Sequence, residues 1–249
     1  MVKRLGRMLR DAPEIPQFVR DYAELRRQQK LSTVQFPFGE LYPCLDTRQA
    51  SAGTAKGHYF HQDLLVARRI FANAPRLHVD VGSRIDGFVA HVASFRTIEV
   101  FDVRPLHSTI SNVRFRQADM MAPLDSALSG YSDSVSCLHA LEHFGLGRYG
   151  DTVDYEGYLK GLANLTDVLA TGGKLYLSVP IGPQRIEFNA HRVFSVGYLL
   201  SLVSAFRIEA FSYVDDRGDL HENAELAADA VAANFDCRYG CGILELTKK

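Results

Sequence analysis

Around residues 76–95 the hydrophobic positions recur first at every second residue, as in a strand, and then at every third or fourth residue, as in a helix. Leu77, Val79 and Val81 alternate with other residues up to Gly82, and apolar residues recur at helical spacing from Ile85 onward. This pattern predicts a strand, a glycine turn and a helix. In open α/β folds, such a junction presents free backbone N–H groups at the carboxyl edge of a parallel sheet, where nucleotide-like ligands bind.

The same alternation of strand and helix patterns continues through most of the chain. A helix is expected from His58 to just before Pro75. Further helices are expected at 85–95, 158–169 and 199–206, and Gly172 and Gly173 are expected to end the helix at 158–169. Strands are expected at 98–102, 113–115, 133–138, 174–180, 208–214 and 242–247. Strands and helices at this spacing predict a doubly wound, mostly parallel sheet with helices on both faces.

Two segments depart from the alternation. Residues 1–56 contain one amphipathic helix at about 16–29 and a stretch rich in Pro, Gly, Ser and Thr. We expect them to form an extension packed on the core, with contact to an anionic substrate or lipid headgroup as the alternative. The acidic connector at 215–236 is either a lid or a surface loop. Residues 57–249 are therefore the predicted main domain.

Composition narrows the class of protein and its partners. The chain has 249 residues, 47% hydrophobic and 23% charged, with a net charge of −1. This balance favours one large globular domain and gives no global attraction to nucleic acid or to an anionic membrane. No apolar run reaches membrane-spanning length, and no signal peptide precedes the domain, so we expect a cytoplasmic protein. Its four cysteines fit no CxxC pair and are expected to be reduced, structural thiols.

Acidic residues end the first three predicted strands. Asp80 lies at the first strand, Asp102 ends the second and Asp119 follows the third. An acidic residue about 20 positions beyond the first turn is placed to hydrogen-bond ribose hydroxyls, and Asp102 meets that spacing.

The segment His139-Ala-Leu-Glu142-His143 matches the H-x-x-E-H pattern of a group of zinc peptidases. That chemistry needs both histidines on one helical face. Here the motif follows a strand directly, and Gly145 and Gly147 interrupt any helix, so we disfavour a peptidase. A divalent ion at Asp151, His143 or Asp215 is an alternative, although we expect no metal.

Several residues are candidates for binding an acceptor substrate. The glycine-rich stretch after the fourth strand has the composition of a mobile loop, or of an ordinary long connection. Aromatic and hydrogen-bonding side chains there and nearby suit a polyhydroxylated or phosphorylated molecule. The candidates are Tyr59, His61, Arg148, Tyr149, Arg185 and Asn189, and the first two could equally be structural.

Residues 57–247 resemble the class I S-adenosylmethionine (SAM)-dependent methyltransferases. The resemblance lies in the acidic strand ends, in Leu141-Glu142-His143, in Gly172-Gly-Lys-Leu-Tyr-Leu-Ser-Val-Pro180 and in His191-Arg-Val-Phe-Ser195. Within that superfamily, the phrases Tyr59 to Ala67, His78 to Gly87 and His143 to Gly150 resemble an uncharacterised bacterial and animal family.

The resemblance implies a Rossmann-like fold with seven strands in the order 3-2-1-4-5-7-6, in which strand 7 is antiparallel to the others. It implies SAM at the carboxyl edge, with the methionine portion near Asp80 and Gly82, the ribose at Asp102 and the adenine at Asp119. Ser83, Arg84 and His139 complete the implied cofactor set. The usual D/E-x-G-x-G-x-G turn has Arg84 and Asp86 in place of two glycines. Either Arg84 pairs with the cofactor carboxylate, or the site has been repurposed.

Methyl transfer to oxygen requires alignment of the reactants and removal of a proton. His139, His143 and His191 are the candidate bases, with Glu142 as an orienting group or alternative base. His143 is the first choice, because the fourth-strand exit faces the acceptor in the enzymes that the chain resembles.

The resulting hypothesis is a SAM-dependent O-methyltransferase of a small molecule, on a sugar, nucleotide-sugar or glycan-related acceptor in polysaccharide biosynthesis. One alternative is a binding protein that keeps the fold without methyl transfer. The other is a metal-using enzyme with a histidine-rich pocket. The sequence leaves the oligomeric state open.

Overall fold

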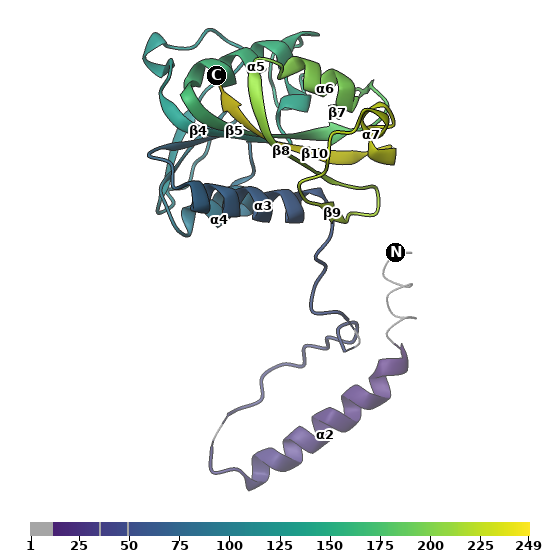
Figure 1. Cartoon of the computed structure of the whole chain (residues 1–249). Coiled ribbons are helices and arrows are strands. Elements are labelled where there is room, and N and C mark those ends of the chain that lie inside the picture. Colours follow the sequence, from purple (N-terminus) through teal and green to yellow (C-terminus); the bar gives the residue numbers. More distant parts are fainter. Residues whose placement is uncertain (1–11, 35, 49) are drawn as a thin grey trace. The chain divides into compact units, whose positions relative to one another are not determined.

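The computed structural model describes residues 12–34, 36–48 and 50–249 of the chain (Figure 1). The chain divides into two compact units, Met1–Thr54 and Ala55–Lys249. Part of the predicted N-terminal extension, at residues 1–11, lies outside the described residues. The packing of this extension on the core stays a prediction.

The first unit contains the predicted amphipathic helix. A short 3-10 turn, η1 (Ala12–Glu14), leads into α2 (Ile15–Leu31), with Pro16 in its first turn. Proline suits that position, because the first helical N–H groups have no partner within the helix. Within the unit, the ring of Tyr22 packs edge-on against Phe38 at 5.5 Å, and the Arg26 guanidinium lies over the same ring.

Among the described residues, eight strands of the second unit form one sheet in the order β3-β2-β1-β4-β5-β10-β8-β9. The first five neighbours in this order run parallel, and β10 is antiparallel to both β5 and β8. The predicted order therefore holds, with one short strand, β9, added at the edge. The strands are β1 (His78–Val81), β2 (Ile98–Asp102), β3 (Val113–Gln117), β4 (Ser132–Leu138), β5 (Leu169–Ile181), β8 (Phe206–Val214), β9 (Leu220–His221) and β10 (Gly240–Lys248).

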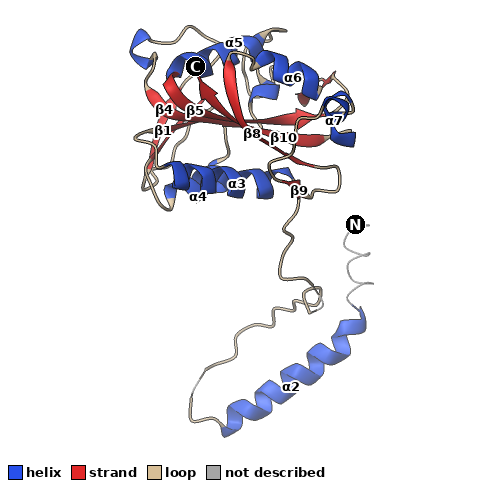
Figure 2. Cartoon of the chain, in the orientation of Figure 1, coloured by secondary structure: helices blue, strands red, loops and turns tan. Residues whose placement is uncertain are grey.

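Helices cover both faces of the sheet, as predicted (Figure 2). α3 (His58–Asn73) and α4 (Ala90–Ala93) lie on one face, and α5 (Gly157–Val168) and α6 (Val196–Leu202) lie on the other (Figure 1). In the described ranges of the chain, no helix is both long and apolar enough to cross a lipid bilayer.

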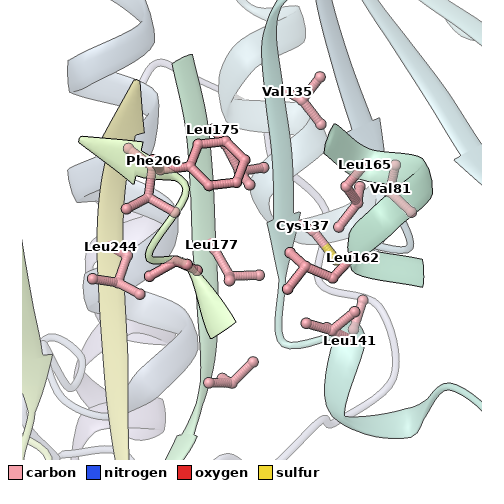
Figure 3. Packing of buried hydrophobic residues seen from close by; sticks show 14 of the residues in the cluster. Val81, Val135, Cys137, Leu141, Leu162, Leu165, Leu175, Leu177, Phe206 and Leu244 are labelled. Atoms are coloured by element: carbon pink, nitrogen blue, oxygen red, sulfur yellow. The ribbon is translucent and has the colours of Figure 1, made fainter. Parts of the chain in front are cut away.

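The core lies between the sheet and these helices, and Figure 3 shows its α5 side. Leu162 and Leu165, on one face of α5, meet Val135 and Cys137 of β4, and all but Leu162 are completely shielded from solvent. Each fully buried leucine contributes roughly 1.5–3 kcal/mol. This packing fixes the end of β4 and therefore the residues that follow it.

Three predicted details are wrong. Gly172 and Gly173 do not stop a helix, because α5 ends at Val168 and the glycines lie in a bulged part of β5, where the β4 pairing shifts register. The helix expected at 85–95 is a π-helical turn, η2 (Ile85–Val89), followed by the short α4. The late helix ends at Leu202, before Val203 and Phe206.

Two features between the main strands were not predicted or were left open. A hairpin of β6 (Arg185–Glu187) and β7 (His191–Val193) precedes α6. The connector at 215–236 folds into β9, α7 (Ala228–Ala232) and η5 (Asn234–Asp236). Its Phe235 packs against Phe211 and Tyr213, with ring centroids 5.1 and 4.7 Å apart. The connector therefore lies against the sheet. Short 3-10 turns, η3 (Ser126–Leu128) and η4 (Leu141–His143), flank β4.

Candidate active site

A cavity of about 360 Å³ opens at the carboxyl ends of β1, β2 and β4. Its position follows from the topology. β2 and β4 lie on opposite sides of β1, so the strand order reverses there, and ligands bind at such a switch point in open α/β sheets. Of the predicted cofactor set, the cavity is lined by Gly82, Ser83, Arg84, Asp102, Asp119 and His139. Of the predicted base and acceptor residues, it is lined by His143, Tyr59, Arg148 and Tyr149.

The turn after β1 is organised by Asp80. Its carboxylate accepts hydrogen bonds from the Ser83 amide and hydroxyl, at 3.1 and 2.8 Å, and from the Ser136 hydroxyl at 2.6 Å. Complete burial raises the pKa of Asp80 to about 7, although these hydrogen bonds act to lower it. Asp80 lies behind the cavity wall, so it shapes the turn and is not itself among the lining residues.

Gly82 is required where it stands. Its φ is +78°, and a Cβ at this position would lie 2.8 Å from the Cβ of Ala140. A larger residue would therefore be strained and would crowd the segment after β4. The absence of a side chain keeps the floor of the cavity open.

The two residues that replace the usual glycines pair with each other. Arg84 donates from Nε and Nη2 to the two carboxylate oxygens of Asp86, at 3.0 and 2.7 Å, and both side chains are exposed. Arg84 lines the cavity, whereas Asp86 does not. The charged pair therefore occupies the rim and leaves the floor of the cavity free.

Asp102 is held by a residue that the sequence analysis did not select. Arg104 donates from Nε and Nη2 to the Asp102 carboxylate, at 3.0 and 2.6 Å, and its amide donates at 2.8 Å. The guanidinium also lies 4.6 Å from the ring centre of Tyr149. A carboxylate offers about four acceptor positions, so these bonds leave about one for a ligand.

Asp119 is less encumbered. One carboxylate oxygen accepts the Met121 amide at 2.8 Å, which closes a tight turn after β3. The side chain lines the cavity and remains half-buried. It keeps acceptor capacity for a polar group of a ligand.

Glu142 connects two histidines after β4. Its Oε1 lies 2.7 Å from Nδ1 of His139 and 3.7 Å from Nε2 of His143, and all three side chains are at least nine-tenths buried. Burial lowers the pKa of His139, but Cys241 and Glu142 outweigh it and raise this pKa well above the ordinary value. Burial raises the pKa of Glu142, but His139 outweighs it and brings this pKa below the ordinary value. The H-x-x-E-H residues thus lie together, with a hydrogen bond between His139 and Glu142 and with His143 within ion-pair distance of the same carboxylate.

His143 has the protonation state that a base needs. Its Nδ1 lies 2.7 Å from the carbonyl oxygen of Ala190, which can only accept, so Nδ1 carries the hydrogen and Nε2 has the lone pair. Burial lowers the pKa of His143, against the opposing influence of Glu142. The ring is therefore neutral at pH 7, with a basic nitrogen beside a carboxylate.

The glycine-rich stretch after β4 is tied down by Asp151. Its carboxylate accepts from the amides of Gly145, Gly147 and Tyr149, at 2.9, 3.2 and 3.1 Å. These bonds favour the predicted ordinary connection over the mobile loop. They also present Arg148 and Tyr149 to the cavity.

Other predicted site residues lie elsewhere within residues 50–249, which are described without a gap. His191 pairs with Glu187 at 2.9 Å in the β6–β7 hairpin, and Arg185 bonds the same carboxylate at 2.7 Å. His61, on α3, and the exposed Asn189 also lie outside the cavity lining. Asp215 is a turn residue bonded to His221, so it does not join Asp151 and His143 around an ion. The predictions for His191, His61, Arg185 and Asn189 therefore lack support from the cavity.

The residues that the sequence analysis missed are Arg104, His58 and Cys241. Arg104 follows Asp102 by two positions, which is a signal for a local ion pair. His58 and Cys241 lie far apart in the sequence and meet His139 only through the fold. No local pattern indicates that meeting.

Two comparisons concern the sequence. A profile of the family described as Caenorhabditis protein of unknown function, DUF268, matches residues 106–235. This range includes Asp119, the Glu142 cluster, Asp151 and the β6–β7 hairpin. No curated protein matches the chain.

Solved structures with a similar fold are numerous, and three illustrate it. The Burkholderia thailandensis 1,6-didemethyltoxoflavin-N1-methyltransferase, crystallised with 1,6-didemethyltoxoflavin and S-adenosylhomocysteine, is 14% identical, with TM-score 0.54 over 76% of this chain and 79% of that one. The [4+2]-cyclase SpnF is 18% identical, with TM-score 0.54 over 76% and 80%. The N-methyltransferase NodS from Bradyrhizobium japonicum WM9, in complex with S-adenosylhomocysteine, is 13% identical, with TM-score 0.50 over 77% and 88%. At these identities the likeness shows the class I methyltransferase fold, which confirms the fold prediction.

Proposed function

The chain belongs to the DUF268 family, and from this premise we propose that it is a SAM-dependent methyltransferase that acts on a hydroxyl group of a small molecule. The observation that carries the proposal is the convergence of Gly82, Asp102, Asp119 and His143 on one cavity. These residues come from four separate segments, and each has the chemistry that one part of the reaction needs. The fold shared with methyltransferases supports the same conclusion.

The lining residues fit SAM. Gly82 lines the cavity without a side chain and so gives a ligand close access to the backbone, whereas a Cβ there would crowd Ala140, which also lines the cavity. Asp119 offers a carboxylate oxygen for the adenine amino group, and Asp102 offers one for a ribose hydroxyl. When bound, SAM supplies an electrophilic methyl group on a sulfonium. Arg84 and Asp86 do not oppose this fit, since they neutralise each other at the rim.

His143 is the proposed general base. The Ala190 carbonyl fixes the tautomer with the lone pair on Nε2, and that nitrogen takes the proton from the acceptor hydroxyl as the methyl group is transferred. Glu142, 3.7 Å away, then stabilises the imidazolium. Direct contact of Glu142 with the acceptor is not required.

The finer proposal is an acceptor that contains a sugar. Tyr149 presents an aromatic ring to the cavity, flanked by the guanidinium groups of Arg104 and Arg148 at 4.6 and 5.2 Å. An aromatic ring beside cationic hydrogen-bond donors suits a polyhydroxylated ring or a phosphate. Arg185 and Asn189 do not line this cavity, so this part of the proposal is argued from fewer residues than the sequence predicts.

One observation favours a second function, a binding protein without methyl transfer. The Asp102 carboxylate is already engaged three times by Arg104. SpnF, which has a similar fold, is described as a [4+2]-cyclase and not as a methyltransferase.

Calorimetric titration of the full chain with SAM and S-adenosylhomocysteine distinguishes the two functions. Micromolar binding, about −8 kcal/mol, together with loss of binding in Asp102→Ala, supports the methyltransferase. S-adenosylhomocysteine release is then measured with nucleotide-sugar acceptors, with His143→Ala as the inactive variant and the exposed His107→Ala as its control. Absence of binding to both cofactor forms would refute methyl transfer and favour the binding protein.

A further inference from the structure

Two histidines and a cysteine meet beside the cavity, and the proposed methyl transfer assigns none of the three a chemical step. His58 begins α3, His139 directly follows β4, and Cys241 is the second residue of β10. One donor atom of each lies within 4.8 Å of the other two. The rings of His58 and His139 are stacked, with centroids 5.1 Å apart and an interplanar angle of 12°.

The sheet topology brings these residues together. Because β10 is antiparallel, its first residues lie at the same edge as the carboxyl ends of the parallel strands, and Cys241 pairs with Pro180 near the end of β5. His139 is anchored at that edge by its amide, which donates to Ser178 of β5 at 3.0 Å. The start of α3 then adds His58. Three elements of the main unit therefore hold the donors in place.

An unpartnered nitrogen points independently to a ligand. Among the described residues, Nε2 of His139 has no hydrogen-bond partner, although the side chain is only 4% exposed. A polar atom that is buried without a partner destabilises the fold unless a ligand pairs with it. Nδ1 of the same ring is bonded to Glu142 at 2.7 Å, so Nε2 is the nitrogen that a ligand would use.

The Cys241 thiol is similarly underused. Its sulfur lies 3.8 Å from Oε1 of Gln62 and 3.9 Å from the Gly242 carbonyl, both weak contacts for a thiol donor, and it also interacts with the ring of His139. Its side chain is completely buried, and its neighbourhood includes two imidazole rings. The sulfur therefore lies where it could share an ion with the two rings.

We propose that His58, His139 and Cys241 bind a zinc ion. Two imidazoles and a thiolate form a borderline-soft donor set that suits Zn²⁺ and excludes Mg²⁺ and Ca²⁺, which take oxygen ligands. In tetrahedral zinc sites the donor atoms lie about 3.3 to 3.6 Å apart, so these donors need to close by at most about 1.5 Å. Because the ion binds a neutral imidazole and a thiolate, the protons on Nε2 of His139 and on the sulfur of Cys241 are released to solvent.

Glu142 completes the site in a second role. A histidine that binds a metal through one ring nitrogen donates a hydrogen bond from the other ring N–H to a carboxylate. This bond fixes the orientation of the ring and increases its basicity. The His139–Glu142 bond has this arrangement. Three protein donors leave one tetrahedral position for water or a substrate atom, and because His139 also lines the cavity, the ion lies at the cavity margin.

Cobalt substitution of the chelator-treated full chain tests the proposal. Co²⁺ is expected to bind at one equivalent, with a thiolate charge-transfer band and the visible bands of a tetrahedral site, and Zn²⁺ is expected to displace it. His58→Ala should weaken Zn²⁺ binding at least 100-fold in competition with a chromophoric chelator. Glu142→Gln should weaken it about 10- to 100-fold.

The matched control is Cys237→Ser, because Cys237 is also buried but lies outside the three-donor cluster. Cys241→Ala should abolish the charge-transfer band, whereas Cys237→Ser should retain it. His58 is half-buried at a helix start, so His58→Ala keeps the test valid if Cys241→Ala does not fold. Zinc affinity unchanged in His58→Ala, or a cobalt spectrum without the thiolate band, would overturn the proposal. Both outcomes are independent of SAM binding.

Discussion

Arg104 engages both carboxylate oxygens of Asp102, from Nε at 3.0 Å and from Nη2 at 2.6 Å. In the proposed function, the same carboxylate receives the ribose. The ligand and Arg104 therefore compete for acceptor positions, and Arg104 is free to swing aside, because its side chain is 42% exposed.

This competition gives the first prediction. Asp102→Ala should weaken S-adenosylhomocysteine binding at least tenfold, since it removes the ribose acceptor. Arg104→Ala should leave the affinity unchanged or increase it, because it frees the carboxylate. Calorimetry on both variants measures the two effects. A loss in Arg104→Ala as large as that in Asp102→Ala would mean that the ion pair itself forms the binding site.

The second prediction concerns the pH dependence of turnover. A base works in its neutral form, so kcat should increase with pH through the pKa of His143 and then level off. Burial lowers that pKa below the ordinary histidine value, so the plateau should already be reached at pH 7. His143→Ala should reduce kcat about 100-fold or more and leave cofactor affinity unchanged.

Glu142→Gln sharpens this test. Glu142 opposes the lowering of the His143 pKa, so its neutralisation should move the acid limb of the profile to lower pH. An acid limb that stays in place would argue against the coupling between these two side chains.

The third prediction uses two glycines of the Asp151-bound segment. Gly145 and Gly150 both have positive φ, at +78° and +83°. A Cβ on Gly145 would lie 2.0 Å from the Asp154 carbonyl oxygen, whereas Gly150 has open space around it. Gly150→Ala should cost about 1–2 kcal/mol from backbone strain alone. Gly145→Ala should cost clearly more, as measured by urea unfolding, and equal losses would show that the close contact relaxes freely.

The fourth prediction concerns stability and pH. His78 is completely buried in β1, with its ring nitrogens 2.8 and 3.1 Å from the hydroxyls of Ser134 and Ser136. Burial lowers its pKa to about 3. Between about pH 3 and 6.5 the unfolded chain therefore binds one more proton at this residue than the folded chain does. The contribution of His78 to stability should increase with pH across that window and be constant above it.

The variant His78→Gln isolates this effect. Its free energy of unfolding, compared with that of the unsubstituted protein, should diverge by about 1.4 kcal/mol per pH unit in the window. Asp80, whose pKa is raised to about 7, contributes in the opposite direction, but it is present in both proteins and cancels. Parallel stability curves for the two proteins would contradict the prediction.

Local patterns were sufficient to predict the main strands, and the resemblance supplied their order in the sheet. Strands β1, β2 and β4 mix apolar and polar residues, and their apolar residues recur at strand spacing. Gly172 and Gly173 misled because glycine signals both a helix stop and a strand bulge, and the choice depends on the pairing partner of β5.

The cavity was predictable where its residues end a strand, as Asp102 does, or lie in the turn just after one, as Asp119 and His143 do. The approach of Cys241 to His139 was not predictable, because it depends on the antiparallel entry of β10 between β5 and β8. The position of His191 was not predictable either, because the β6–β7 hairpin was not predicted. In that hairpin His191 pairs with Glu187, and it does not line the cavity.

The central place of β10 has a consequence for the order in which the domain can fold. β10 lies between β5 and β8, so β8 and β9 cannot join the rest of the sheet until β10 is in place. A chain in which β10 has not yet paired has two separate sheet fragments and exposes an unpaired edge of β5. Completion of the sheet, and with it the meeting of Cys241 and His139, therefore comes late in folding, and the partly folded chain is the form most in need of a chaperone.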